Sequence, residues 1–218
     1  MDQSEIEQVI RSFHELYYSM GQSGRGTWMK TFWMGVPLAK CPLDLWIYQE
    51  LIHAIRPKLI VETGTAFGGT ALYLANLCAL IGIGEVVTID TVARPSLPQH
   101  ARISYLSGSS ADPAIVREIH TRSAGKSPVL VILDSDHHRD HVLAELRAYH
   151  ELVTAGSYLI VEDTNVNGRP VLPGFGPGPL EAIDAFLSEN RDFEIDRACE
   201  KFLMTFSPLG FLRKRQSA

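Results

Sequence analysis

The stretch KLIVETGTAFGGT, residues 58–70, decides the fold. Its first half, Lys58–Glu62, is a short apolar run rich in β-branched residues, which is typical of a buried strand. Glycines follow at positions 64, 68 and 69, and an apolar stretch with helical character covers 70–80. Glycines in such a turn permit tight backbone geometry and close approach of a ligand, and the start of a helix offers free N–H groups to an anion. The stretch therefore predicts a strand, a ligand-binding turn and a helix.

The same alternation continues along the chain. Further apolar runs predict strands at 85–90, 103–106, 129–134 and 157–163, and helices are predicted at 113–122 and 139–153. Continuous apolar strands separated by helices indicate a parallel sheet covered on both faces. We therefore expect an α/β protein with a Rossmann-like, doubly wound, mostly parallel sheet. The C-terminal part predicts a helix over 180–189 and an antiparallel hairpin of 193–196 with 202–206.

The N-terminal part predicts a helical cap on this core. Apolar residues recur at helical spacing over 4–20, a Gly/Ser-rich break follows at 21–27, and a second helix is expected at 45–55. We interpret the whole chain, 1–218, as one domain with a helix and cap segment (1–44) and a Rossmann-like core (45–218). Residues 165–179 are long for a loop without periodicity, which is typical of a lid.

Composition narrows the classes of function. The chain has 218 residues, a net charge of −5 and three widely separated cysteines, so neither a basic nucleic-acid-binding face nor a CxxC metal cluster is expected. The first residues lack the apolar core of a signal peptide, and the longest apolar stretch is too short to span a bilayer. We expect a cytoplasmic protein with a small-molecule partner, no nucleic acid and no membrane. Its amphipathic N-terminal helix is compatible with a homo-oligomer.

Acids stand at the ends of the predicted strands: Glu62, Asp90, Asp134 and the pair Glu162 and Asp163. In a doubly wound sheet, ligands bind outside the carboxyl ends of the strands. The turn is no dinucleotide fingerprint, because an acid replaces the leading glycine of GxGxxG and would repel a pyrophosphate. That acid suits an ammonium group, and Asp90 is placed to accept hydrogen bonds from ribose hydroxyls. S-adenosylmethionine has both an amino-acid end and a nucleoside end, and it fits this pattern.

The segments ETGTAFGG, TID, SGSSAD, LDSDHH and VEDTN together resemble class I S-adenosylmethionine-dependent methyltransferases. More narrowly, they resemble the cephalosporin hydroxylase and sugar (rhamnosyl) O-methyltransferase family, from about residue 40 to residue 165. The resemblance implies a set of cofactor contacts: Glu62, Gly64 and Gly68 at the methionine end, Thr70 at its carboxylate, Asp90 at the ribose, Gly108 to Ser110 beside the adenine, and Asp134 at the edge of the same site.

A second group of polar residues, Asp134–His138 with Glu162 and Asp163, predicts a metal site. Adjacent parallel strands would bring Asp134 and Glu162 side by side, and carboxylates in close contact repel unless they are protonated or bridged by a cation. Oxygen ligands without cysteine favour Mg²⁺ or another hard divalent cation. We predict Asp134, Glu162 and Asp163 as ligands. Asp136 is the alternative to Asp134, which we favour because it ends the strand.

This arrangement resembles catechol O-methyltransferase and the macrolide-sugar O-methyltransferases, in which a divalent metal grips the acceptor oxygens. His137 is then the candidate general base, because an unperturbed histidine has a pKa of about 6.5. Asp136 is the reserve. We interpret His138 and His141 as residues that open a helix, and Asp140 and Glu145 as solvated helix positions.

Three functions remain open at this point. The first is a metal-dependent O-methyltransferase that moves a methyl group to a hydroxyl of a small metabolite, a sugar or a natural product. The second is a hydroxylase or other oxidoreductase component, with Asp134, His137 and His138 as a facial triad for iron. The third is a non-catalytic methyltransferase-like partner subunit. Binding of S-adenosylmethionine separates the first and third from the second, and turnover separates the first from the third.

Overall fold

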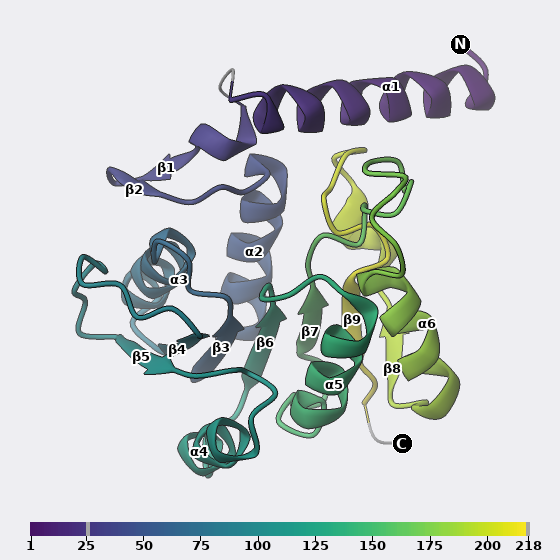
Figure 1. Ribbon diagram of the computed structural model, residues 1–218. Helices are drawn as coiled ribbons and strands as arrows, with labels where there is room; N and C mark the ends of the chain where they lie inside the picture. Colours follow the sequence, from purple (N-terminus) through teal and green to yellow (C-terminus); the bar gives the residue numbers. More distant parts are fainter. Residues whose placement is uncertain (25–26, 217–218) are drawn as a thin grey trace.

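A seven-stranded sheet between two layers of helices forms the core of the computed structural model, which describes residues 1–24 and 27–216 (Figure 1). The strand order is β5-β4-β3-β6-β7-β9-β8. All neighbours pair in parallel except β9, which is antiparallel to both β7 and β8. The strands are β3 (Leu59–Thr63), β4 (Glu85–Asp90), β5 (Ile103–Ser107), β6 (Val129–Leu133), β7 (Tyr158–Val161), β8 (Phe193–Ile195) and β9 (Phe211–Lys214). The predicted doubly wound fold is confirmed.

Two separate apolar layers explain why the central strands carry consecutive apolar residues. Along β3, Leu59 and Val61 pack towards one face and Ile60 towards the other, and all three are fully buried. One face is covered by α4 (Pro113–Ser123), α5 (Arg139–Tyr149) and α6 (Pro179–Glu189). The other is covered by α2 (Pro42–Ile55) and α3 (Gly69–Leu80). Alternation of side chains across the sheet thus buries both sets of residues.

The N-terminal segment lies across the end of the molecule at which β3, β6 and β7 finish (Figure 1). It consists of α1 (Gln3–Gln22), a 3₁₀ turn (η1, Trp28–Lys30) and a small hairpin of β1 (Phe32–Trp33) and β2 (Val36–Pro37). A capping box between Asp2 and Glu5 begins α1, as expected for a stable helix start. Of the break predicted at 21–27, positions 25 and 26 lie outside the described residues.

The predicted partner strand 202–206 is wrong. β8 pairs instead with β9, in a register that places Ile195 opposite Leu212. Segment 202–206 packs under the N-terminal helix, where the ring of Phe206 stacks on His14 and contacts Tyr18 edge-on. The aromatic residues that looked like one side of a hairpin therefore belong to a small satellite core. A short 3₁₀ turn (η2, Arg197–Glu200) leads into this segment.

The loop at 165–179 is held to the rest of the protein near its start and in its middle. Val166 and Val171 are buried in the same satellite core as Phe206.

No helix within residues 1–24 and 27–216 is long and apolar enough to cross a membrane.

Candidate active site

A cavity of about 350 Å³ opens at the carboxyl ends of the central parallel strands. Its size is that of a small-ligand pocket. It is lined by Gly64, Ile89, Asp90, Thr91, Gly108, Ser109, Ser110, Ser135, Asp136 and His141. Five of the sequence-predicted cofactor residues, Gly64, Asp90 and the three from Gly108 to Ser110, thus share one cavity. The predicted reserve base, Asp136, lines it as well.

Asp90 is held rigidly at the end of β4. Its two carboxylate oxygens accept hydrogen bonds from the backbone N–H groups of Ala66 and Val92, each at 2.8 Å. Each oxygen has further acceptor capacity, so the fixed carboxylate is still able to receive the hydroxyl groups of a sugar. The geometry suits the ribose contact that the sequence predicts.

Glu62 lies beneath the glycine turn and is fully buried. Its Oε2 accepts a hydrogen bond from Thr88 Oγ1 at 2.6 Å, whereas its Oε1 has no partner in the described chain. Burial raises the pKa of this carboxyl to about 8. An unused buried oxygen costs free energy unless a donor reaches it, and a nearby ammonium group would satisfy it and favour the ionised form.

The glycines of the turn serve chain packing in addition to ligand access. Gly64 has a φ of +89°, and a Cβ there would lie 1.9 Å from the carbonyl oxygen of Asp134. Gly68 caps α3 with a φ of +78°. The first helical hydrogen bond runs from Leu72 N to Gly68 O, which leaves the N–H groups at the start of α3 available to an anion. Thr70, predicted to contact the cofactor carboxylate, lies in this first turn and is buried.

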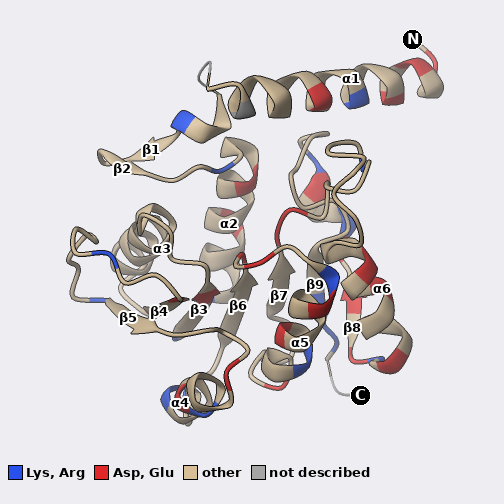
Figure 2. Ribbon diagram, in the orientation of Figure 1, with Lys and Arg blue, Asp and Glu red and all other residues tan. Residues whose placement is uncertain are grey.

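A buried lysine joins two of the strand-end acids. Lys40 Nζ forms ion pairs with Asp134 and with Glu162, the latter at 2.6 Å from Oε2. The hydroxyl of Tyr48 donates to the other oxygen of Glu162 at 2.6 Å. Burial opposes the charge of Lys40, yet Asp134 and Glu162 raise its pKa overall. The ammonium of Lys40 is therefore a permanent cation at this point. It lies in acidic surroundings, since Figure 2 shows acidic residues along the loops that follow the central strands.

Asp134, His137 and Asp163 form the one group in the described chain whose ligand atoms are arranged for a metal ion. One ligand atom from each lies within 4.8 Å of the others. His137 Nε2 is 3.2 Å from Asp163 Oδ2. Two of the three predicted ligands, Asp134 and Asp163, are in this group. Glu162 contacts Lys40 and Tyr48 instead, and the predicted base His137 takes the third place.

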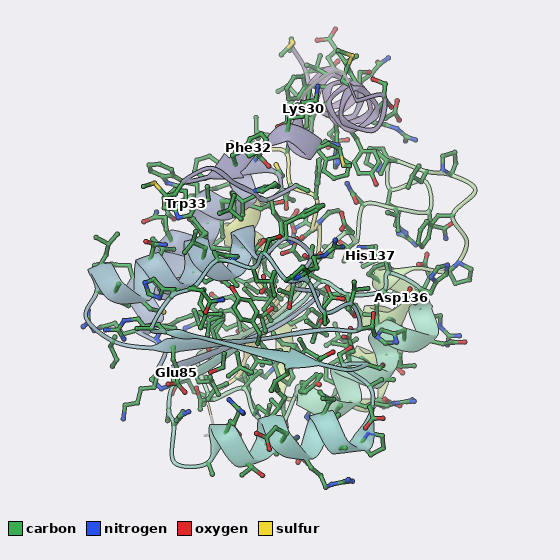
Figure 3. All side chains as sticks on the ribbon, turned by 60° about the vertical axis from the view of Figure 1, so that its left-hand side comes forward. Lys30, Phe32, Trp33, Glu85, Asp136 and His137 are labelled. Carbon is green, nitrogen blue, oxygen red and sulfur yellow. The ribbon has the colours of Figure 1, made fainter. Side chains whose placement is uncertain are left out.

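His137 and Asp136 lie close together in the loop just before α5, far from Glu85 at the opposite end of the sheet (Figure 3). Asp136 is engaged locally, because its Oδ1 accepts from the backbone and the ring nitrogen Nδ1 of His138, at 2.9 and 2.6 Å. His138 is exposed, and its ring stacks on Phe175. The helix-opening role predicted for His138 agrees with this placement.

The prediction for Glu145 is wrong. Its side chain is fully buried, because α5 turns this face onto the sheet together with Val142 and Leu146. Ser135 Oγ donates to Glu145 Oε1 at 2.7 Å, and His141 Nε2 lies 3.1 Å from the same Oγ. The sequence did contain a signal for this burial. Glu145 is three residues after Val142 and next to Leu146, so helical spacing places it on the apolar face of the helix.

Comparison with known proteins identifies the family. The profile of the family Rhamnosyl O-methyltransferase/CmcI matches residues 25–215. The chain belongs to this family. A Rhamnosyl O-methyltransferase of Mycobacterium bovis (strain BCG / Pasteur 1173P2) is 42% identical over 211 residues, covering 94% of this chain and 84% of the relative. A Rhamnosyl O-methyltransferase of Mycobacterium leprae (strain TN) is 40% identical over 218 residues, covering 96% and 92%.

Solved structures share the fold. The CmcI-N160 apo-structure superposes with a TM-score of 0.67 at 21% sequence identity, over 87% of this chain and 78% of that chain. The family confirms the resemblance found in the sequence, and with it the expected enzyme class: an S-adenosylmethionine-dependent O-methyltransferase.

Proposed function

We propose that this protein transfers a methyl group from S-adenosylmethionine to a hydroxyl of a sugar or of a glycosylated natural product, with the help of a divalent cation. One observation carries the proposal: the cavity beside Asp90 and the cluster of Asp134, His137 and Asp163 lie at the carboxyl ends of one run of parallel strands, β4-β3-β6-β7. The relatives at 40–42% identity are named Rhamnosyl O-methyltransferases, which supports a sugar hydroxyl as acceptor.

The residues present fit a cation. Carboxylates are hard ligands that suit Mg²⁺, and Asp134 and Asp163 supply two of them in the candidate group. The structurally similar cmcI-D160 was solved with Mg and SAM. We propose Asp134 and Asp163 as ligands and retain Glu162, next to Asp134 across the Lys40 ammonium, as the third. A cation bound there would polarise the acceptor hydroxyl and lower its pKa.

His137 is the proposed general base. Its Nε2 lies 3.2 Å from Asp163 Oδ2, and this contact with the carboxylate fixes the orientation of the ring. His137 would remove the proton of the acceptor hydroxyl, with Asp136 as reserve. At the other end of the site, Asp90 would hold the ribose and Glu62 the ammonium group. The start of α3, with Thr70, would hold the carboxylate.

The iron-oxygenase alternative is not supported by the geometry. A facial triad needs two histidines and one carboxylate around one point. His138 instead bonds to Asp136 and stacks on Phe175, while Asp163 completes the cluster of Asp134 and His137. A non-catalytic partner subunit remains as the second candidate, because it would keep the same cofactor contacts.

The experiment combines calorimetric binding of S-adenosylhomocysteine with a methyl-transfer assay on simple rhamnosides, read by mass spectrometry. We expect binding, and gain of one methyl group by the sugar. His137→Gln should lower kcat by about 10²- to 10⁴-fold with unchanged S-adenosylhomocysteine binding. The exposed His53→Gln is the control and should keep full activity. Absence of binding would refute the proposal, and binding without turnover on any hydroxyl acceptor would favour the partner subunit.

Two further proposals concern the state of the protein. We infer a homo-oligomer formed through α1, because Val9, Phe13 and Leu16 on this helix are 51–60% exposed. Phe13→Glu should lower the mass measured by sedimentation equilibrium, and an unchanged mass would remove α1 from the interface. The cytoplasm is the proposed compartment, and the three free cysteines are compatible with it.

A further inference from the structure

Four residues form a polar cluster behind one wall of the cavity: Ser110, Ser135, His141 and Glu145, here called the wall cluster. Ser110, Ser135 and His141 line the cavity, and Glu145 lies fully buried behind them. His141 Nε2 is 3.2 Å from Ser110 Oγ and 3.1 Å from Ser135 Oγ. The Oε2 atom of Glu145 has no partner in the described chain.

The single protons of the two hydroxyl groups fix the direction of every bond in the wall cluster. Ser135 Oγ donates its proton to Glu145 Oε1 at 2.7 Å, so this oxygen can only accept from His141. His141 Nε2 therefore carries a hydrogen, which it shares between the oxygens of Ser135 and Ser110. The Glu145 carboxylate, 3.6 Å from His141 Nε2, also raises the pKa of His141, which favours the protonated nitrogen.

Ser110 Oγ, as an acceptor from His141, keeps its own proton for another partner. Within residues 1–24 and 27–216, its hydroxyl has no hydrogen bond other than that to His141. The side chain is nearly buried, and the cavity is the space it borders. The wall cluster thus presents a hydroxyl donor with a preset direction to whatever occupies the cavity.

The position of the wall cluster indicates which part of a ligand it meets. The glycine turn after β3 lies on one side of Asp90, and Ser110, which follows β5, lies on the other. With the ribose at Asp90 and the amino-acid end at the turn, the base of the nucleoside extends towards Ser110. Adenine ring nitrogens are acceptors and match a hydroxyl donor.

We propose that His141 and Glu145 are positioning residues that direct the Ser110 hydroxyl to a ring nitrogen of the cofactor adenine. This inference rests on the proposed function, since it assumes a nucleoside in the cavity. Ser110 makes the contact, and His141 and Glu145 act through it. The wall cluster thereby contributes to selection of an adenine nucleoside.

A double-mutant cycle tests the coupling. Calorimetry would measure S-adenosylhomocysteine binding to the wild type, Ser110→Ala, His141→Phe and the double variant. Each single change should weaken binding about two- to tenfold, the effect of one hydrogen bond. The double variant should bind no more weakly than Ser110→Ala alone. His150→Phe, at the other end of α5, is the matched control and should bind like the wild type.

Adenine analogues give a second readout that does not require His141 to be replaced. In each of three S-adenosylhomocysteine analogues, a C–H group would replace one nitrogen of the adenine ring, at position 1, 3 or 7. One of these analogues should bind the wild type as weakly as the parent compound binds Ser110→Ala. The Ser110→Ala variant should bind that analogue and the parent compound equally well. If His141→Phe fails to fold, this comparison decides alone.

The outcomes distinguish failure of the wall-cluster proposal from failure of the proposed function. Independent effects of Ser110→Ala and His141→Phe, multiplying in the double variant, would overturn the wall-cluster proposal. So would equal losses for all analogues in the wild type and in Ser110→Ala. A wild type that binds no S-adenosylhomocysteine would overturn the proposed function as well.

Discussion

Lys40 Nζ lies 2.6 Å from Glu162 Oε2, and both side chains are almost completely buried. The lysine belongs to the segment between the small β1–β2 hairpin and α2, whereas Glu162 follows β7 at the centre of the sheet. One ion pair therefore ties the cap to the acid-rich end of the sheet. The same ammonium contacts Asp134, so it neutralises two carboxylates that would otherwise repel.

Replacement of Lys40 by methionine should leave these two carboxylates buried without a cation. Breaking a buried pair by removal of one partner costs about 3–5 kcal/mol, so we expect a loss of this order in the free energy of unfolding, measured by urea denaturation. Mg²⁺ should raise the melting temperature of Lys40→Met more than that of the wild type. Lys201→Met, which breaks an exposed pair with Glu50, is the control and should change stability little. Equal losses in the two variants would contradict a structural role for the buried pair.

Gly64→Ala should displace the backbone at the acid-rich end of the sheet. The new Cβ would lie 1.9 Å from the carbonyl oxygen of Asp134, so that residue or the turn must shift. Gly82→Ala is a matched control, because Gly82 has a similar φ of +75° and nothing within 4 Å of the added carbon. Both changes introduce left-handed strain of about 1–2 kcal/mol.

The expected difference concerns the site. Gly64→Ala should lower methyl transfer at least about tenfold, because a displacement of roughly 1 Å at reacting groups costs up to 10²-fold. Gly82→Ala should retain the wild-type rate. Equal activities would show that the contact of Gly64 with Asp134 has no bearing on the site.

The fold and part of the site follow from local sequence patterns. Asp90 and Asp134 were found because a parallel sheet brings the ends of its apolar strands together, and this rule needs no knowledge of packing. Lys40 was not assigned a partner, since its ion pairs join segments that are 94 or more positions apart. Partners at such distances are chosen by the tertiary fold.

The errors have the same origin. Glu145 looked solvated because glutamates on helices usually are, but the adjacent Val142 and Leu146 placed its face on the sheet. Strand β9 was assigned to the wrong segment because 202–206 and 211–214 are both short and both begin with Phe-Leu. Only pairing with β7 decides between them, and pairing between distant strands leaves no periodic trace in either one.

His14 should make the protein sensitive to mild acid. It is buried against Phe206, and burial lowers its pKa to about 4. An unfolded histidine takes up a proton near pH 6.5, so the unfolded state binds more protons between pH 6.5 and 4. The contribution of neutral His14 to stability is therefore complete above pH 6.5 and is lost as the pH falls towards 4.

Between pH 7.5 and pH 5 this loss amounts to about 2 kcal/mol. His14→Gln, which keeps a polar group for Asn165, should reduce the fall in unfolding free energy over that interval by this amount. Urea denaturation at the two pH values measures it, and the exposed His53→Gln serves as control. A variant with the same pH dependence as the wild type would assign the acid sensitivity to other groups.

Asp163→Asn should separate the metal requirement from cofactor binding. Asp163 belongs to the cluster with Asp134 and His137, but it does not line the cavity that contains Asp90 and Ser110. Loss of one carboxylate ligand weakens a site for a hard cation, and even groups that only support ligands cost about 10- to 100-fold in metal affinity. We therefore expect the Mg²⁺ concentration needed for half-maximal methyl transfer to rise at least about tenfold. The Kd of S-adenosylhomocysteine should stay within about a factor of three of the wild-type value. This change is smaller than the change in Kd that the loss of one hydrogen bond to a charged group would cause.

The matched control is Asp140→Asn, the same change at a side chain that is 92% exposed on α5. It should leave both quantities unaltered. Dialysis of the wild type against a chelator should abolish methyl transfer and preserve S-adenosylhomocysteine binding, and added Mg²⁺ should restore the activity. Full activity after chelation would argue that Lys40, the cation already between Asp134 and Glu162, is the only positive charge the reaction uses. His137 would then act as a base beside Asp163 without a metal, and Asp163→Asn should lower kcat at every Mg²⁺ concentration.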